Sequence, residues 1–277
     1  MLRRYILFLK KHPLITAAIA IAYGVLCIKK VPTTNYFEMF LVRTMLCGAM
    51  SFFLYQISGD KTLASAYNST WYVIKVAISL WIFAFPVGLL SFFSNAASDI
   101  PVRDNATLEL LIMFALFIFV GLFEELTFRA IINDAIIYKF RNKKFVFVLS
   151  AFLCSLIFGA VHVVGYELPT LMAWLQAIGK TVSTGIFGLS LLFLYWKTRN
   201  IWACGVVHGV YDFLVGFSLA IFDIPSDSLG HYIVEDTYAM SMIRVYAINA
   251  LINLVIFFII WKKIGKKIDY DKIREEW

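Results

Sequence analysis

Charged residues are scarce in this chain, and their scarcity decides its class. Only 16% of the 277 residues are charged, whereas 61% are hydrophobic and the mean hydropathy is +0.79. An ordinary soluble domain carries about 25% charged residues. A soluble protein of this length cannot bury so large an apolar excess, because its surface must still be polar. The composition excludes disordered, collagen-like and ordinary cytosolic proteins, and it predicts an all-α integral membrane protein.

Cysteines and basic tracts are also too few to build other classes of protein. The four cysteines show no CxxC spacing and all fall in apolar segments, which excludes a disulfide scaffold and indicates small hydrophobic side chains: Cys27, Cys47, Cys154 and Cys204. The net charge is +7, but the cations form short clusters between apolar runs. That distribution suits anchoring in a lipid bilayer. We therefore expect no nucleic-acid partner, and we expect no cofactor.

Long apolar runs without alternation of period two predict a polytopic helical bundle rather than a β-barrel. A hydrocarbon core about 30 Å thick needs about 20 apolar residues per helix. By this measure one membrane domain, residues 1–277, contains about eight transmembrane helices: 13–30, 38–57, 70–93, 107–123 (continuing to about 137), 145–165, 171–195, 200–222 and 242–261. For the first run a cleaved signal peptide is the alternative, although the Lys29-Lys30 flank favours a retained helix.

The loop charges predict the orientation. Residues 139–144, the loop with Lys197 and Arg199, and the tail after residue 261 are basic, whereas the intervening loops contain mainly acids. The positive-inside rule then predicts that both termini are cytoplasmic, with Lys29 and Lys30 as the exception. The Lys- and Ile-rich composition with short loops is typical of a bacterial cell membrane protein.

A pair of acids interrupts the end of the fourth apolar run, where each ionisable group costs at least ~2.5 kcal/mol to insert. Glu125 and Arg129 are four residues apart, on one helix face and in the favourable acid-first order. Glu124 is rotated by about 100° from Glu125 and has no obvious partner on its own helix. This spacing predicts that one acid is neutralised structurally and the other is available for chemistry. A plain ion pair at the membrane boundary is the alternative.

Two histidine motifs follow in later apolar runs. Phe158 lies one turn before His162 near the end of an apolar helix, where a lone histidine is more often a cap or an interfacial residue. His208 and Asp212 are four residues apart and face the same way. Two such groups in one apolar helix are hard to explain by packing alone, although Asp212 could simply fix the tautomer of His208.

Together these groups match the requirements of water-mediated amide hydrolysis, in which a carboxylate activates water and other polar groups orient it and stabilise the oxyanion. The chain contains no GxSxG and no HExxH motif, which disfavours serine and zincin mechanisms. A metal-dependent variant, with Glu and His as zinc ligands, stays open. A proton-coupled transporter is a further alternative, disfavoured by the lack of visible repeats.

The ordered motifs Glu-Glu-x-x-x-Arg, Phe-x-x-x-His and His-x-x-x-Asn/Asp, each on a separate helix, resemble the CPBP family. That family comprises CAAX prenyl endopeptidases, bacteriocin-processing and immunity proteins, and abortive-infection proteins. The resemblance covers residues 105–222, as a catalytic core, and implies a glutamate-type intramembrane endopeptidase acting on a peptide or membrane-associated protein. It implies the following roles: Glu124 as the base, His162 as a holder of the water, His208 and Asp212 as the oxyanion-stabilising pair, and Glu125, Arg129 and Phe158 as structural support.

One departure weakens the analogy to the prenyl endopeptidases, which carry Asn where this chain has Asp212. An ionised carboxylate cannot donate to an oxyanion, so Asp212 is either protonated or acts only by orienting His208. We therefore favour the bacterial branches of the family. A non-catalytic scaffold or bacteriocin-immunity-like protein that retains the fold is the main alternative. Simple counting along antiparallel spans also puts Glu124 and His162 at opposite depths, so displaced helices would have to bring them together.

Overall fold

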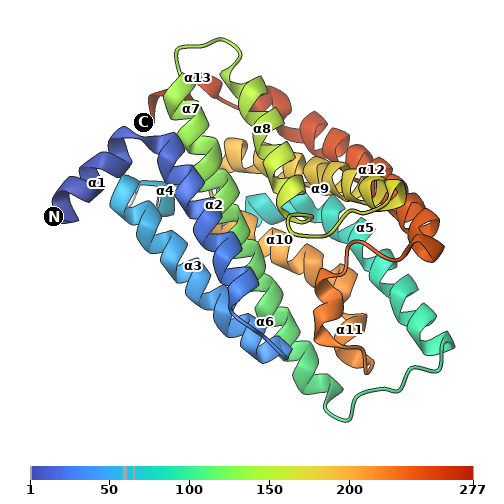
Figure 1. The fold of residues 1–277 in the computed structure, drawn as a ribbon. Helices are drawn as coiled ribbons and strands as arrows, with labels where there is room; N and C mark the ends of the chain where they lie inside the picture. The colour runs from blue at the N-terminus through green and yellow to red at the C-terminus, as the bar shows by residue number, and fades with distance from the viewer. Residues whose placement is uncertain (1, 59–60, 65, 277) are drawn as a thin grey trace. The chain divides into compact units, whose positions relative to one another are not determined.

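The structure, a computed structural model, describes residues 2–58, 61–64 and 66–276 (Figure 1). Within those residues six helical stretches are long and apolar enough to cross a bilayer: α2 (Pro13–Lys30), α3 (Tyr36–Ser58), α5 (Thr70–Ala97), the continuous run Ala106–Phe140, α9 (Leu171–Thr198) and α12 (Asp236–Ile264). Two shorter apolar helices are α8 (Val146–Val161) and α10 (Ile201–Gly216). The predicted all-α polytopic membrane protein is confirmed, and the protein is integral to the membrane.

The remaining helical segments are short. They are α1 (Leu2–Lys11), α4 (Lys61–Ala64), α11 (Ser218–Ile221), the 3-10 turns η2 (Ser226–Gly230) and η3 (Gly265–Lys267), and α13 (Tyr270–Glu275). The run Ala106–Phe140 has three parts, namely α6 (Ala106–Glu125), the π-helix η1 (Leu126–Asn133) and α7 (Asp134–Phe140).

Two predicted spans were drawn too long, and both carry a histidine motif. The span expected over 145–165 corresponds to α8, which ends at Val161. Residues 162–165 form turns, and Gly165 has a φ of 86°. The span expected over 200–222 is divided into α10 and α11 near Phe217. Hydropathy does not register these breaks, since the residues on both sides of each are apolar.

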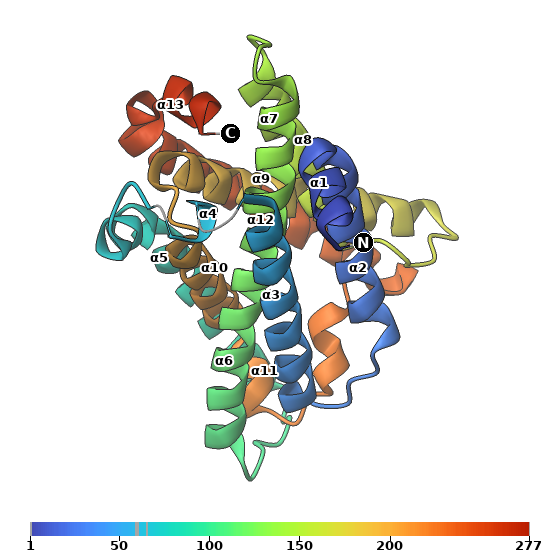
Figure 2. The same cartoon turned by 90° about the vertical axis from the view of Figure 1, so that its left-hand side faces the viewer.

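The chain forms two compact units, and each is described by itself. The first comprises Met1–Ala135 and Thr198–Leu229, and the second comprises Ile136–Lys197 and Gly230–Trp277. In the first unit α6 packs along α3 on one side and α10 on another, and α10 also packs on α5 (Figures 1 and 2).

Three glycines allow α6 and α10 to touch backbone to backbone. A Cβ built on Gly121 would lie 2.3 Å from the carbonyl oxygen of Gly205, and one on Gly209 would lie 2.4 Å from that of Phe117. Gly205 and Gly209 have the small-xxx-small spacing that permits close approach of membrane helices. The crossing therefore depends on the absence of side chains at these positions, and it fixes how the last turn of α6 faces the middle of α10.

In the second unit α8 packs equally closely on α9, since a Cβ on Gly159 would lie 2.0 Å from the carbonyl oxygen of Thr181. The segment leading into α12 is held by side chains of α9 and α12. The Gln176 amide donates to the carbonyl of Val234 at 3.0 Å and accepts from its N–H at 2.9 Å. Gln176 itself is fully buried.

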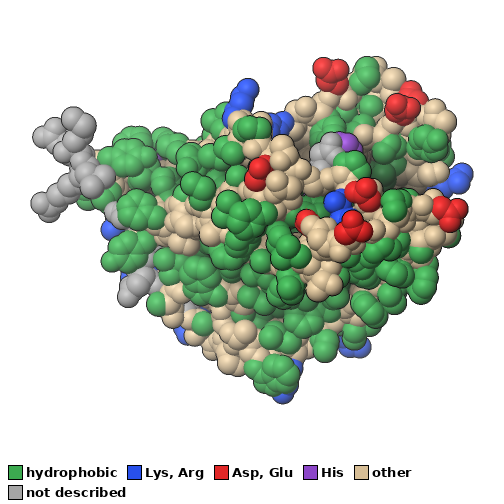
Figure 3. Space-filling view, turned by 90° about the horizontal axis from the view of Figure 1, so that it is seen from below, with side chains coloured by type: hydrophobic (Ala, Val, Ile, Leu, Met, Phe, Trp, Pro, Cys, Tyr) green, Lys and Arg blue, Asp and Glu red, His purple; other side chains and the backbone are tan. Residues whose placement is uncertain are grey.

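Apolar side chains cover much of the outside of the molecule (Figure 3). Large examples in both units are more than 70% exposed, such as Met45, Val148 and Leu171. Exposure of this kind is a liability in water. In hydrocarbon it is the expected covering of a membrane helix, which agrees with the composition.

Candidate active site

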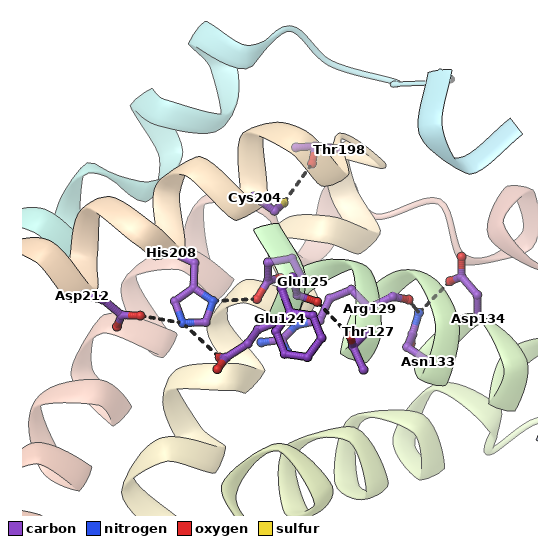
Figure 4. Close-up of polar contacts among 11 residues, drawn as sticks. Glu124, Glu125, Thr127, Arg129, Asn133, Asp134, Thr198, Cys204, His208 and Asp212 are labelled. Carbon is purple, nitrogen blue, oxygen red and sulfur yellow. Dashed lines mark hydrogen bonds and ion pairs between the residues drawn. The ribbon is translucent and has the colours of Figure 1, made fainter. Parts of the chain in front are cut away.

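The close crossing of α6 and α10 brings together the acids at the end of α6 and the polar pair of α10. Glu124 and Glu125 occupy the last turn of α6, and His208 and Asp212 lie on successive turns of α10. Figure 4 shows the imidazole of His208 between the carboxylates of both glutamates and that of Asp212. Groups 83 residues apart in sequence thus form one cluster.

Glu125 is the buried acid of the pair. Its carboxylate is completely buried. The Oε2 atom lies 3.1 Å from Nε of Arg129, whose side chain is also buried, and this confirms the predicted ion pair one turn apart. Its Oε1 atom lies 3.0 Å from Nδ1 of His208. Since a carboxylate oxygen can only accept, the Nδ1–H of His208 donates this hydrogen bond.

The opposite nitrogen of His208 faces the other two carboxylates. Its Nε2 atom lies 3.4 Å from Oδ2 of Asp212 and 3.7 Å from Oε2 of Glu124. Glu124, which had no predicted partner on its own helix, therefore has a neighbour on α10. The Glu124 side chain is 16% exposed and that of Asp212 is 25% exposed, whereas Glu125 is inaccessible. The open side of the cluster is the side of Glu124 and Asp212.

The charges of this cluster require a proton on that open side. Nδ1 of His208 donates to Glu125, so a neutral ring would direct the lone pair of Nε2 at two carboxylates. Two acceptors and a lone pair so close together, in apolar surroundings, are unfavourable. A proton on Nε2, or on one of the carboxyls of Glu124 and Asp212, removes the conflict. The geometry therefore requires one proton among Nε2 of His208, Oε2 of Glu124 and Oδ2 of Asp212.

A second buried ion pair, which the sequence analysis missed, lies nine residues beyond Glu125. Both guanidinium Nη atoms of Arg199 donate to the carboxylate of Asp134, at 2.8 and 2.7 Å, and both residues are buried. Arg199 had been counted among the basic loop charges. Its partner is 65 residues away, so no local spacing reveals the pair. An acid next to Asn133 inside an otherwise apolar run was the available sequence signal.

The π-helix η1 lies between the two acids, Glu125 and Asp134, and contains Arg129. The Asn133 amide at its end donates to the carbonyl of Arg129 at 3.3 Å and to Oδ1 of Asp134 at 2.8 Å. At its start the Thr127 hydroxyl donates to the carbonyl of Phe123 at 2.8 Å. These bonds satisfy polar side chains that are buried in the protein, and π segments are frequent at functional sites.

The second histidine motif lies in the second unit. Nδ1 of His162 is 2.8 Å from the carbonyl oxygen of Phe158, so Nδ1–H donates and Nε2 carries the lone pair. The two rings meet edge to face with centroids 5.2 Å apart, and Phe158 is buried. His162 is thus the C-cap of α8, which is the role that a lone histidine near a helix end more often has. Its Nε2 atom is a hydrogen-bond acceptor. The structure brings Glu124, Glu125, Arg129, His208 and Asp212 together and places Phe158 with His162.

Among the residues that the structure describes, no group of three or more His, Cys, Asp and Glu side chains has the arrangement needed to hold a metal ion. The carboxylates of the cluster above contact the guanidinium of Arg129 and the imidazole of His208.

Residues 106–214 match the family model described as type II CAAX prenyl endopeptidase Rce1-like. The matched region begins with α6 and ends within α10, so it spans all three motifs. No curated protein and no solved structure matches the chain. The family match confirms the resemblance to the CPBP family and supports, at family level, a CAAX-type intramembrane protease.

Proposed function

Because residues 106–214 match the type II CAAX prenyl endopeptidase Rce1-like family, we propose that the chain is an intramembrane endopeptidase in which Glu124 activates the attacking water. The observation that carries the proposal is the unequal environment of the two adjacent acids. Glu125 is buried and bonded to Arg129 and His208, whereas Glu124 keeps an accessible carboxylate next to the same imidazole. A general base has to reach its water, and of the two adjacent glutamates only Glu124 has that access.

In the proposed reaction Glu124 takes a proton from water as the oxygen attacks the carbonyl carbon of a peptide bond. Negative charge develops on the carbonyl oxygen, and the N–H at Nε2 of a protonated His208 donates a hydrogen bond that stabilises it. The C–N bond then breaks, and the amine leaves with the proton that Glu124 had taken. One water is consumed and one carboxylic acid and one amine are released, so atoms and protons balance.

Asp212 fits this scheme as a partner of His208 rather than as an oxyanion donor. Its Oδ2 is 3.4 Å from Nε2, so an ionised Asp212 favours the protonated, donating form of the ring. As an acceptor, Asp212 therefore acts on His208 and not on the oxyanion. The Asn of the prenyl endopeptidases is not required at this position. We assign His208 as the catalytic group of the pair and Asp212 as its positioning residue.

His162 is proposed to hold the attacking water. Its Nδ1–H donates to the carbonyl of Phe158, which fixes the tautomer in which Nε2 is the acceptor nitrogen that would orient the water. Phe158, packed edge to face on the ring, limits its rotation. We place the catalytic core within residues 105–222, in a single membrane domain, and we propose a bacterial membrane location with both termini cytoplasmic.

The substrate class is a peptide or membrane-associated protein, and a C-terminal CAAX sequence is the first to test, because the family description names it. The purified protein in liposomes is given fluorogenic CAAX peptides, one prenylated and one unmodified. We expect cleavage by the wild type and a loss of at least about 100-fold in kcat for Glu124→Gln. Glu109→Gln is the matched control, because Glu109 lies in the first turn of α6 and is bonded only to Asn105 in an exposed position.

Cleavage that survives in Glu124→Gln would refute the mechanism. Absence of cleavage by the wild type, together with full biological complementation by Glu124→Gln, would instead support the non-catalytic scaffold or immunity-like protein. Comparison of the two peptides decides whether the prenyl group is recognised.

A further inference from the structure

The buried pair of Asp134 and Arg199 lies outside the groups that touch a substrate in the proposed function. Asp134 is fully buried and Arg199 is 5% exposed, and their contact is bidentate. Forming such a pair requires removing two charges from water, so it is weak support for stability alone. We therefore ask which part of the structure the Asp134–Arg199 pair positions.

Arg199 immediately precedes α10, and its backbone is strained, with φ at 47°. The segment around it is anchored to the loop before α5, since the carbonyl of Thr198 accepts from the N–H of Tyr67 at 2.8 Å and Asn200 donates to the carbonyl of Asn68 at 3.1 Å. A strained residue that persists is held by its surroundings. The start of α10 is thus fixed, and Asp134 ties it to the helix that begins as α6.

The same two helical runs are tied a second time at the site. Glu125 binds His208 on α10, and Asp134 binds Arg199 just before it. The two acids are nine residues apart, and so are the two partners. Two attachments at matched spacing fix the axial register of one helix against the other, because a slip along the axis breaks both.

The π-helix η1 makes this double attachment possible. In an α-helix nine residues cover about two and a half turns, so Glu125 and Asp134 would point to opposite sides. A π turn takes about one residue more, and nine residues then cover about two full turns. Because residues 126–133 are π-helical, both carboxylates face α10.

We propose that the Asp134–Arg199 ion pair is a positioning element of the active site, which acts through η1 to hold His208 against Glu125. This inference rests on the proposed function for its catalytic consequence but not for its structural one. Asn133 connects the two ion pairs through the carbonyl of Arg129. Loss of the distant pair therefore loosens the register at His208 without removing any group that reacts.

The test uses the full chain in liposomes and the variants Asp134→Asn and Asp134→Arg/Arg199→Asp. The double variant restores opposite charges, and each new residue suits its place, since Arg is a good helix former and Asp tolerates a positive φ. The control is Asp223→Asn, which removes the charge from an ion pair of the same unit whose Asp is 66% exposed.

Two readouts are compared. We expect Asp134→Asn to lower kcat about 10- to 100-fold with little change in KM, as a misplacement near 1 Å does, and the double variant to recover most of that loss. In protein labelled with ¹⁵N-histidine, the ring-nitrogen signals of His208, identified by their absence from His208→Gln, should shift in Asp134→Asn and return in the double variant. Asp223→Asn should change neither.

His208 signals that are identical in wild type and Asp134→Asn would overturn the proposal, whatever the activity. A double variant that folds, by its monodisperse elution in detergent, but keeps the displaced signals would overturn it too. If the wild type and Glu124→Gln alike release no product, the protease proposal fails, while the ring-nitrogen comparison still decides the positioning role.

Discussion

The glycine contact between α6 and α10 offers the sharpest prediction, because one methyl group should open the active site. Gly209→Ala would put a Cβ 2.4 Å from the carbonyl oxygen of Phe117 and 2.6 Å from Cα of Ile118. Both are backbone atoms, which cannot rotate away. Ordinary contact begins near 3.4 Å, so the helices must separate by about 1 Å. Gly48→Ala is the matched control, since Gly48 lies in α3 with no atom within 4 Å of its built Cβ.

The two substitutions should have effects of opposite sign on stability. Alanine favours a helix over glycine by about 0.5–1 kcal/mol, and Gly48→Ala receives this gain alone. At Gly209 overpacking costs about 1–3 kcal/mol, so the net change is a loss. A separation of about 1 Å would also stretch the 3.0 Å contact of His208 with Glu125 beyond hydrogen-bonding range. Misplacement of that size lowers turnover by about 100-fold.

Thermal unfolding in detergent and peptide cleavage in liposomes measure the two effects on the same preparations. We expect Gly209→Ala to unfold at a lower temperature than wild type and to lose most of its turnover, and Gly48→Ala to unfold at an equal or higher temperature with unchanged turnover. Equal behaviour of the two variants would refute the backbone contact of α6 with α10 as the element that positions the site.

Two further substitutions test the buried polar contacts. Glu125→Gln keeps the shape of the side chain but removes the charge that faces the buried Arg129, so we expect a loss of about 3–5 kcal/mol in unfolding free energy and no recovery of cleavage at any pH; a variant as stable as wild type would contradict the ion pair. Gln176→Leu removes both bonds to the backbone of Val234, which should cost about 1–3 kcal/mol and speed proteolytic nicking of residues 230–235; unchanged proteolysis would contradict that anchoring.

Local spacing predicted those parts of the site that lie on one helix. The contact of Glu125 with Arg129 and that of His208 with Asp212 each join residues four apart, and both are present. The long helices could be predicted from hydropathy, because about 20 consecutive apolar residues are needed to cross the hydrocarbon core as a helix.

The other contacts of the site depend on which helices cross and at which residues. The apolar pattern of one helix does not specify either. The bond from His208 to Glu125 and the pair of Asp134 with Arg199 join residues 83 and 65 positions apart. The π-helix η1 was also missed, since its residues, taken as an α-helix, give an equally acceptable apolar pattern. The Gly205–Gly209 spacing was the one sequence signal for the crossing, and it identifies a close contact without naming the partner helix.

The lengths of α8 and α10 have a consequence for water. Each contains 16 residues and therefore spans about 24 Å, which is less than a hydrocarbon core of about 30 Å. A helix that ends short of the far surface exposes its last carbonyls to lipid, where unsatisfied polar groups are costly. The His162 ring satisfies one of them at Phe158. The N–H groups of His162 and Val163 satisfy the carbonyls of Gly159 and Ala160. Helices of this length would still leave less hydrocarbon for water to cross, so the same shortness that makes them incomplete as spans would supply a hydrolytic reaction with its second reactant.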